Sequence, residues 1–195
     1  MDIAIVQYNA GNTQSVINAL NRLGVEPRLT HDAEELRKAD KIIFPGVGEA
    51  GSTMRHLKSM GLDQVLPTIK QPFLGICLGM QLMCRHSEEN DTECLGMFDL
   101  EVKRFIPARH EKVPHMGWNN LELRADKSIY ENMEDLHVYF VHSYYVPVSE
   151  FTTARSNYIH PFSAGIHRDN FHAVQFHPEK SGAQGQKILE NFLKL

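Results

Sequence analysis

A cysteine flanked by glycines is the first feature of the sequence that could carry out chemistry. Cys77 lies in the run Gly-Ile-Cys-Leu-Gly (75–79), which follows an apolar stretch beginning near Phe73 and precedes a helical pattern. In a sharp strand-to-helix turn, flanking glycines prevent clashes between the joined elements and hold the cysteine in a strained backbone. The helix N-terminus then favours the thiolate over the thiol. A buried structural cysteine is the alternative interpretation.

A histidine and a glutamate near the C-terminus supply the partners that a cysteine nucleophile needs. His177 could act as the base for Cys77, and Glu179 could orient the imidazole ring. In an extended segment residues two apart point the same way, so Glu179 would reach the far nitrogen of the ring. Alone, His-Pro-Glu is typical of the end of a strand. Together with the cysteine turn it predicts a Cys77–His177–Glu179 triad.

The run Pro-Gly-Val-Gly (45–48) follows an apolar strand pattern and could complete such a site. Two glycines in four residues leave backbone N–H groups free to approach a ligand or to rotate, which suits an oxyanion hole. We expect donors from Val47 and Gly48, and a further one from the N–H of Leu78, directly after the nucleophile. A plain turn between strand and helix is the alternative.

An α/β fold must position these groups. The first half alternates apolar strands (3–6, 26–30, 41–44, 72–77) with helical patterns, one capped by Asn12 and ending at Gly24, one at 33–38 and one from Cys77 through Leu82. Continuous apolar runs indicate strands buried on both faces, so a mostly parallel sheet covered by helices on both sides is predicted.

The second half changes character. Short strands are predicted at 100–106, 121–123, 137–141, 152–156, 162–167 and 172–176, as antiparallel additions to the sheet, before an amphipathic helix at 183–195. Without a repeat, a low-complexity tract or a linker, residues 1–195 are expected to form a single domain.

Composition excludes several classes of function. The net charge of −4 and the scattered Lys and Arg argue against nucleic-acid binding. No apolar run reaches the roughly 20 residues of a membrane span, and no signal-peptide pattern opens the chain. The three cysteines fit reduced thiols in a cytoplasm. The histidines of the densest stretch (160, 167, 172, 177) lack helical metal-site spacing, so neither a metal nor a cofactor is expected.

These elements in this order resemble the class I (triad) glutamine amidotransferases over essentially the whole chain. The resemblance implies a three-layer fold and hydrolysis of glutamine through a Cys77 thioester. It also implies that Gln81 and Glu89 hold the polar groups of glutamine, and that Ser143 and Tyr144 contribute backbone contacts to its carboxylate. Two positions depart from the family pattern, Gln7 in place of Asp and Ala50 in place of Phe.

Four further segments are similar to the amidotransferase subunits of imidazole glycerol phosphate synthases. They are Asn-Ala-Gly-Asn (9–12), Pro-His-Met-Gly-Trp-Asn (114–119), Tyr-Phe-Val-His-Ser-Tyr (139–144) and Gln-Phe-His-Pro-Glu-Lys-Ser (175–181). The resemblance implies a heterodimer with a (βα)₈-barrel cyclase, which receives the ammonia in histidine biosynthesis. An amidotransferase that supplies ammonia for nucleotide-sugar amidination is the alternative, ahead of a silent regulatory subunit or a stand-alone thiol hydrolase.

Five residues are expected at the partner interface. By resemblance, Asn12, Tyr139 and Lys180 face the cyclase and the ammonia passage. Met116 and Trp118 lie beside proline and glycine, which suggests a loop that presents large apolar side chains, and such side chains are favoured at interfaces. For Trp118 a place in the core is the alternative, and for Lys180 a solvated lysine beside the triad.

Overall fold

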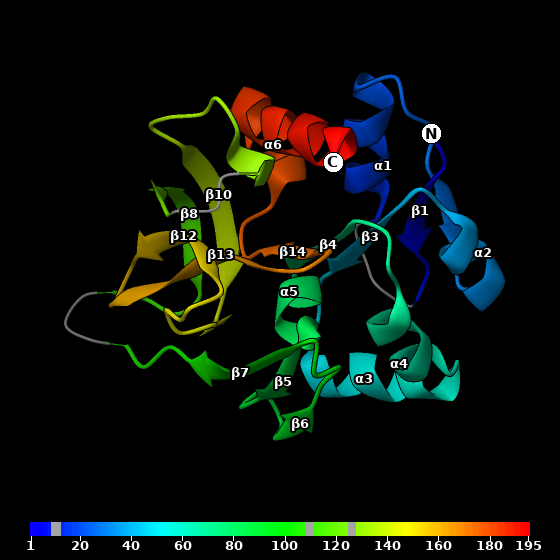
Figure 1. Ribbon diagram of the computed structural model, residues 1–195. Helices are drawn as coiled ribbons and strands as arrows, with labels where there is room; N and C mark the ends of the chain where they lie inside the picture. Colours follow the sequence, from blue (N-terminus) through cyan, green and yellow to red (C-terminus); the bar gives the residue numbers. More distant parts are fainter. Residues whose placement is uncertain (9–12, 108–110, 125–127) are drawn as a thin grey trace.

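The computed structural model describes residues 1–8, 13–107, 111–124 and 128–195, and an eight-stranded sheet lies at its centre (Figure 1). Five strands are parallel, namely β2 (Arg28–Thr30), β1 (Ile3–Val6), β3 (Lys41–Gly46), β4 (Phe73–Cys77) and β14 (Phe171–Val174). The sheet continues antiparallel through β13 (Pro161–Arg168), β12 (Thr152–Asn157) and β9 (Glu122–Leu123). The predicted α/β class, with a mostly parallel sheet and antiparallel additions, is confirmed.

Helices cover both faces of this sheet, because successive strand residues point to opposite sides. On one face Ile3 and Ile5 pack in a core with α1 (Thr13–Arg22) and α6 (Gly182–Lys194). On the other face Ala4 and Val6 pack with α2 (Ala33–Lys38), α3 (Ala50–Ser59) and α5 (Leu78–Met83). The short α4 (Leu62–Val65) and a 3₁₀ turn, η1 (Leu66–Thr68), lead into β4, and η2 (Ser128–Tyr130) packs on α6. Figure 1 shows α1 and α6 on the opposite side of the sheet from α3 and α5.

Several strands of the second half lie outside the central sheet, contrary to our expectation. β8 (His115–Asn120) and β10 (His137–His142) form a two-stranded antiparallel sheet. A four-stranded sheet holds β11 (Tyr144–Tyr145), β7 (Phe98–Arg104), β5 (Cys84–Ser87) and β6 (Thr92–Glu93). The loop predicted for the Met-Gly-Trp segment is therefore wrong. That segment is strand β8, because it pairs with β10 from His115 to Asn120 despite the glycine.

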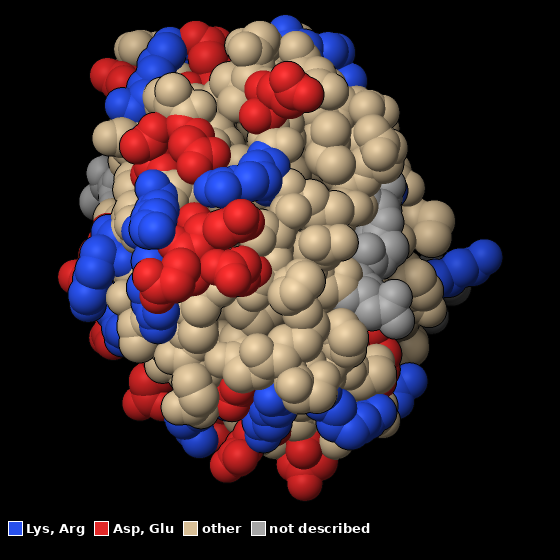
Figure 2. All heavy atoms as spheres, turned by 90° about the vertical axis from the view of Figure 1, so that its right-hand side faces the viewer, with Lys and Arg blue, Asp and Glu red and all other residues tan. Residues whose placement is uncertain are grey.

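Charged side chains lie mainly on the left and lower parts of the face shown in Figure 2, and a broad uncharged area lies at its centre. On the face shown in Figure 2, acidic and basic groups are interspersed rather than gathered by sign. Within the described ranges, no helix has both the length and the apolar character needed to cross a bilayer. The N-cap expected at Asn12 lies outside the described residues, and α1 begins at Thr13.

Candidate active site

The turn from β4 into α5 holds Cys77 in an unusual backbone conformation. Cys77 has φ 54° and ψ −110° and stands at the N-cap of α5. A Cβ on Gly75 would lie 2.3 Å from the Met83 sulfur, and one on Gly79 would lie 2.0 Å from the carbonyl oxygen of Phe44. The clash at position 79 is with backbone, so only glycine fits there, and a side chain at position 75 would force Met83 to move. The strained elbow expected from the sequence is therefore present.

The thiol of Cys77 differs in its surroundings from those of the other two cysteines. Its sulfur lies 3.8 Å from the carbonyl oxygen of Val141 and 3.7 Å from the side-chain nitrogen of Gln175. Burial raises the pKa of the Cys84 thiol and raises the pKa of Cys94 to about 12. Cys84 and Cys94 therefore stay protonated at neutral pH, and neither lies on an elbow beside a base.

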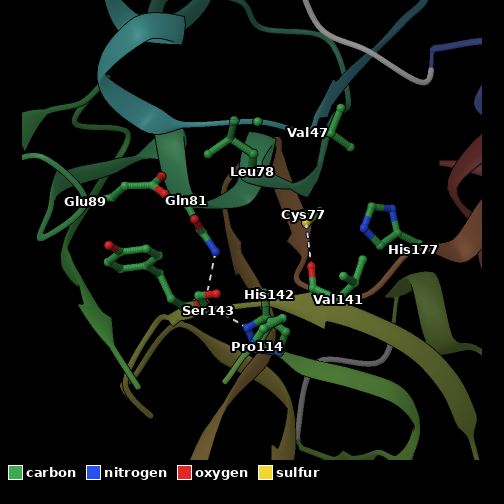
Figure 3. Close-up of a pocket in the computed structure, with 12 residues that line it drawn as sticks. Val47, Cys77, Leu78, Gln81, Glu89, Pro114, Val141, His142, Ser143 and His177 are labelled. Carbon is green, nitrogen blue, oxygen red and sulfur yellow. Dashed lines mark hydrogen bonds between the residues drawn. The ribbon is translucent and has the colours of Figure 1, made fainter. Parts of the chain in front are cut away.

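His177 and Glu179 form a buried pair beside this thiol. The Nδ1 atom of His177 lies 2.8 Å from Oε1 of Glu179, and both side chains are 2% exposed. Burial alone would lower the pKa of His177, but its interactions with Cys77 and Glu179 outweigh burial and raise that pKa to about 10. Nε2 of His177 is buried without a hydrogen-bond partner among the described residues, and the ring lies beside Cys77 (Figure 3). This is the arrangement of a base held by a carboxylate.

The backbone reaches this geometry by a turn rather than by the extended segment that we expected. Glu179 lies in the 3₁₀ turn η3 (Pro178–Lys180), which begins directly after His177. The His177 N–H donates to the carbonyl oxygen of Tyr139 at 2.9 Å, and its carbonyl accepts from the Ser181 hydroxyl at 2.7 Å. The tight turn, not strand alternation, therefore brings the carboxylate back to the imidazole.

The Pro-Gly-Val-Gly turn follows β3 and lies against the elbow. A Cβ on Gly46 would lie 2.6 Å from the Gly79 nitrogen, so the two turns can approach only without a side chain there. Gly48 has φ +111°, a conformation that side-chain-bearing residues rarely adopt. Val47, Gly48 and Leu78 all line the cavity at Cys77.

Sequence reasoning missed Tyr8 at this turn. Its buried hydroxyl donates to the carbonyl oxygen of Pro45 at 2.5 Å, and burial, with a further contribution from Cys77, raises its pKa. The hydroxyl therefore stays protonated and fixes the start of the turn. A tyrosine two residues after a buried strand was the available signal, because a buried hydroxyl needs a partner.

A cavity of about 300 Å³ gathers the residues expected to bind substrate with those expected to react (Figure 3). It is lined by Val47, Gly48, Cys77, Leu78, Gln81, Glu89, Pro114, Val141, His142, Ser143, Tyr144 and His177. Glu89 is half-buried and accepts the N–H of Ala50 at 2.8 Å, and burial raises its pKa. No group of three or more His, Cys, Asp or Glu in the described part of the chain could hold a metal ion.

The cavity, the elbow and the buried His–Glu pair have a geometry that is suited to amide hydrolysis by a thiol. The family model of the class-I glutamine amidotransferases matches residues 4–195. The chain belongs to the class-I glutamine amidotransferases. This confirms the resemblance seen in its motifs.

Relatives narrow the position of this amidotransferase within the family. It is 60% identical, over the full length of both chains, to the imidazole glycerol phosphate synthase subunit HisH of Bacteroides thetaiotaomicron. It is 46% identical to the subunit HisH 2 of Legionella pneumophila, over 99% of this chain and 98% of that one. Its fold matches a solved glutamine amidotransferase with a TM-score of 0.77 at 18% identity, over 100% of this chain and 98% of that one. The fold also matches the structure of PurLQS from Thermotoga maritima, with a TM-score of 0.72 at 16% sequence identity, over 99% of this chain and 97% of that one.

The amidotransferase presents an exposed aromatic face near this cavity. Met116, Trp118, His137 and Tyr139 project from the same side of β8 and β10, where Trp118 is directly opposite Tyr139. Met116 is 63% exposed and Trp118 is 51% exposed. We call these four residues the Trp118 face. The core placement considered for Trp118 is wrong, because the register of β8 turns it outward.

Of the two remaining interface candidates, the structure describes Lys180 but not Asn12. Lys180 is exposed on η3, next to the triad glutamate. Asn12 lies outside the described residues. The assignment of all five residues to a partner interface stays a prediction.

Proposed function

We propose that this chain is the glutaminase subunit of an imidazole glycerol phosphate synthase. It hydrolyses glutamine to glutamate and ammonia and passes the ammonia to a (βα)₈-barrel cyclase in histidine biosynthesis. The observation that carries the proposal is Cys77 on a strained elbow, with the buried His177–Glu179 pair beside it, in a cavity of about 300 Å³. Full-length relatives named as subunits of that synthase support the choice of pathway.

The arrangement implies a two-stage hydrolysis. The Cys77 sulfur attacks the side-chain carboxamide carbon of glutamine while His177 holds the thiol proton. When the C–N bond breaks, His177 gives that proton to the nitrogen, and ammonia leaves a γ-glutamyl thioester. Water then attacks the thioester, His177 takes its proton and returns it to the sulfur, and glutamate leaves. Glu179 keeps the imidazole in orientation through Nδ1.

The developing oxyanion needs donors at the elbow and the neighbouring turn. The Leu78 N–H at the start of α5 is one candidate donor, and the backbone of Val47 and Gly48 supplies the other. Glycine at position 48 allows a peptide there to rotate at small steric cost. Docking of the cyclase would bias this turn toward its donor-bearing form, so that glutamine is hydrolysed when an acceptor is present.

Substitution of the nucleophile in the assembled complex tests the proposal. Cys77→Ala should abolish imidazole glycerol phosphate formation from glutamine, yet leave its formation from free ammonia unchanged, because the cyclase performs that step. Cys94→Ala is the matched control, since Cys94 is partly exposed and does not line the cavity. Glutamine-dependent synthesis that survives in the Cys77 variant would disprove the assignment of the nucleophile.

Capture of the partner tests the pathway separately. The tagged chain, purified from its native lysate, should retain a (βα)₈-barrel cyclase that can be identified by mass spectrometry. Recovery of a nucleotide-sugar amidinating enzyme instead would favour the alternative amidotransferase. Full glutaminase activity without any partner would indicate a stand-alone hydrolase.

A further inference from the structure

A buried glutamine that the mechanism above does not use lies against the nucleophile. Gln175 has no exposed surface, and its side-chain nitrogen lies 3.7 Å from the Cys77 sulfur. Its side-chain oxygen accepts a hydrogen bond of 2.9 Å from the amide of Gln81. The residue directly follows β14 and precedes His177 by two positions, so one short segment supplies two side chains to the same thiol.

A backbone carbonyl fixes the direction of these hydrogen bonds. The carbonyl oxygen of Tyr144 can only accept, and it accepts from Nε2 of Gln81 at 3.0 Å and from Nδ1 of His142 at 2.7 Å. The nitrogen of Gln81, not its oxygen, must therefore face Tyr144. The second hydrogen on that nitrogen goes to the oxygen of Gln175. The nitrogen of Gln175 is consequently the atom that faces Cys77.

This chain of constraints leaves no freedom to reverse either amide. Reversal of Gln81 would set its oxygen against the Tyr144 carbonyl, and reversal of Gln175 alone would set two N–H groups against each other. Both hydrogens of the Gln81 amide are consumed inside the protein. Its oxygen is thus the polar atom that it can offer to the cavity that it lines.

We propose that Gln175 is a positioning residue of the glutaminase site, which directs an N–H at the Cys77 sulfur and fixes Gln81 with its oxygen toward substrate. The proposal rests on the proposed role of Cys77 as nucleophile. A buried thiolate needs compensating donors, and a hydrogen bond to a charged acceptor is stronger than one between neutral groups. The same contact holds the sulfur in one place between the base and the oxyanion turn.

Two substitutions separate the two roles, and both are studied in the complex with the cyclase. Gln175→Glu keeps an oxygen for Gln81 but replaces the N–H that faces the sulfur. It should lower kcat by about tenfold or more and leave KM within about twofold, because a hydrogen bond to a charged group is lost. Gln175→Met, of similar length, removes both contacts and should lower kcat and raise KM. Asn191→Leu, a buried amide on α6 whose nitrogen bonds to the carbonyls of Ile129 and Glu131, is the matched control.

Alkylation gives a second readout that does not depend on turnover. Iodoacetamide labelling of Cys77, located by mass spectrometry, should slow by about tenfold at neutral pH in both Gln175 variants. The control variant should keep the wild-type profile. Wild-type kcat together with a wild-type labelling profile in Gln175→Glu would overturn the inference. If Gln175→Met fails to fold, Gln175→Glu, which preserves the shape, decides. If the proposed function itself were wrong, the wild-type complex would not hydrolyse glutamine, and this outcome is distinct from the result that would overturn the role of Gln175.

Discussion

The cavity at Cys77 and the Trp118 face lie close together but differ in burial and polarity. At the cavity, buried polar side chains are hydrogen-bonded to one another, as in the His177–Glu179 pair and between Gln81 and Gln175. On the Trp118 face, large side chains are exposed to solvent, and the Trp118 ring lies beside the rings of His137 and Tyr139. A closed network serves chemistry, and an open apolar surface is suited to a partner.

The two regions meet at one backbone segment. The side chain of Tyr139 belongs to the Trp118 face, and its backbone contacts the segment of the base. The Tyr139 carbonyl oxygen accepts the N–H of His177 at 2.9 Å, and the Tyr139 N–H donates to the hydroxyl oxygen of Ser181 at 3.0 Å. Strand β10 therefore carries both the Trp118 face and backbone contacts of the His177 segment. A partner that moves Tyr139 would act on His177 through the hydrogen bond between the His177 N–H and the Tyr139 carbonyl. Substitutions in the cavity and on the Trp118 face can therefore test how the two regions differ.

The largest effect is expected inside the cavity. His177→Asn should reduce glutaminase activity by at least about a thousandfold, because no base remains to carry the proton to ammonia. Glu179→Gln leaves the base in place, so its fold loss of glutaminase activity should be smaller than that of His177→Asn by at least about tenfold. Steady-state ammonia release by the complex measures both. The assigned roles would have to be exchanged if the Glu179 variant proved the more damaged of the two.

The next effect is a rise in the glutaminase rate when the cyclase docks. The free chain is expected to be a poor glutaminase, because a turn at Val47 and Gly48 that lacks one oxyanion donor loses about 3 kcal/mol, or about a hundredfold in rate. Rates should rise from free chain to complex, and again with an acceptor analogue in the cyclase. Identical rates in the three samples would remove the link between docking and the cavity.

A smaller effect is expected from the exposed face alone. Trp118→Ala should weaken cyclase binding by about 2 kcal/mol, or about thirtyfold in Kd, as for a central aromatic at an interface. The free energy of unfolding of the free chain should change by no more than about 0.5 kcal/mol, because the side chain is half exposed. Leu29→Ala, an exposed apolar residue on β2, is the control for binding measured by titration calorimetry. Unchanged affinity in the Trp118 variant would place the partner elsewhere.

The last effect is on stability and concerns the buried side of the same two strands. Nδ1 of His115 lies 3.0 Å from Nε2 of His142, and burial lowers the pKa of His115 to about 4 and that of His142 to about 3. Between pH 6.5 and about 4 the unfolded chain therefore binds more protons than the folded one. Stability falls with falling pH by up to about 1.4 kcal/mol per unit and per histidine.

Chemical denaturation across that range checks this titration. His115→Gln should flatten the slope relative to wild type. His137→Gln, on the exposed side of β10, is the control variant. Equal slopes in all three proteins would mean that the two faces of the small sheet do not differ in their proton binding.

Local patterns in the sequence were sufficient for much of the catalytic region. Gly75 and Gly79 around Cys77 predicted the elbow, and the tertiary packing against Met83 and Phe44 supplies the reason for glycine. The family motifs predicted the cavity residues, since they recur at fixed places on the fold. That residues 1–195 form one domain, and that the chain works in the cytoplasm, stay predictions.

Features that depend on contacts between residues far apart in the sequence were decided only by the tertiary structure. The segment around Trp118 was expected to be a loop, because glycine and proline mark turns locally, but its pairing with β10 makes it a strand with an open face. The contacts of Tyr8 with Pro45 and of Gln175 with Cys77 join residues 37 and 98 positions apart. Sequence alone determined which groups could react, because chemistry follows residue type and local spacing. The direction of each hydrogen bond was decided by the fold, because a donor finds its acceptor only when distant strands are brought together.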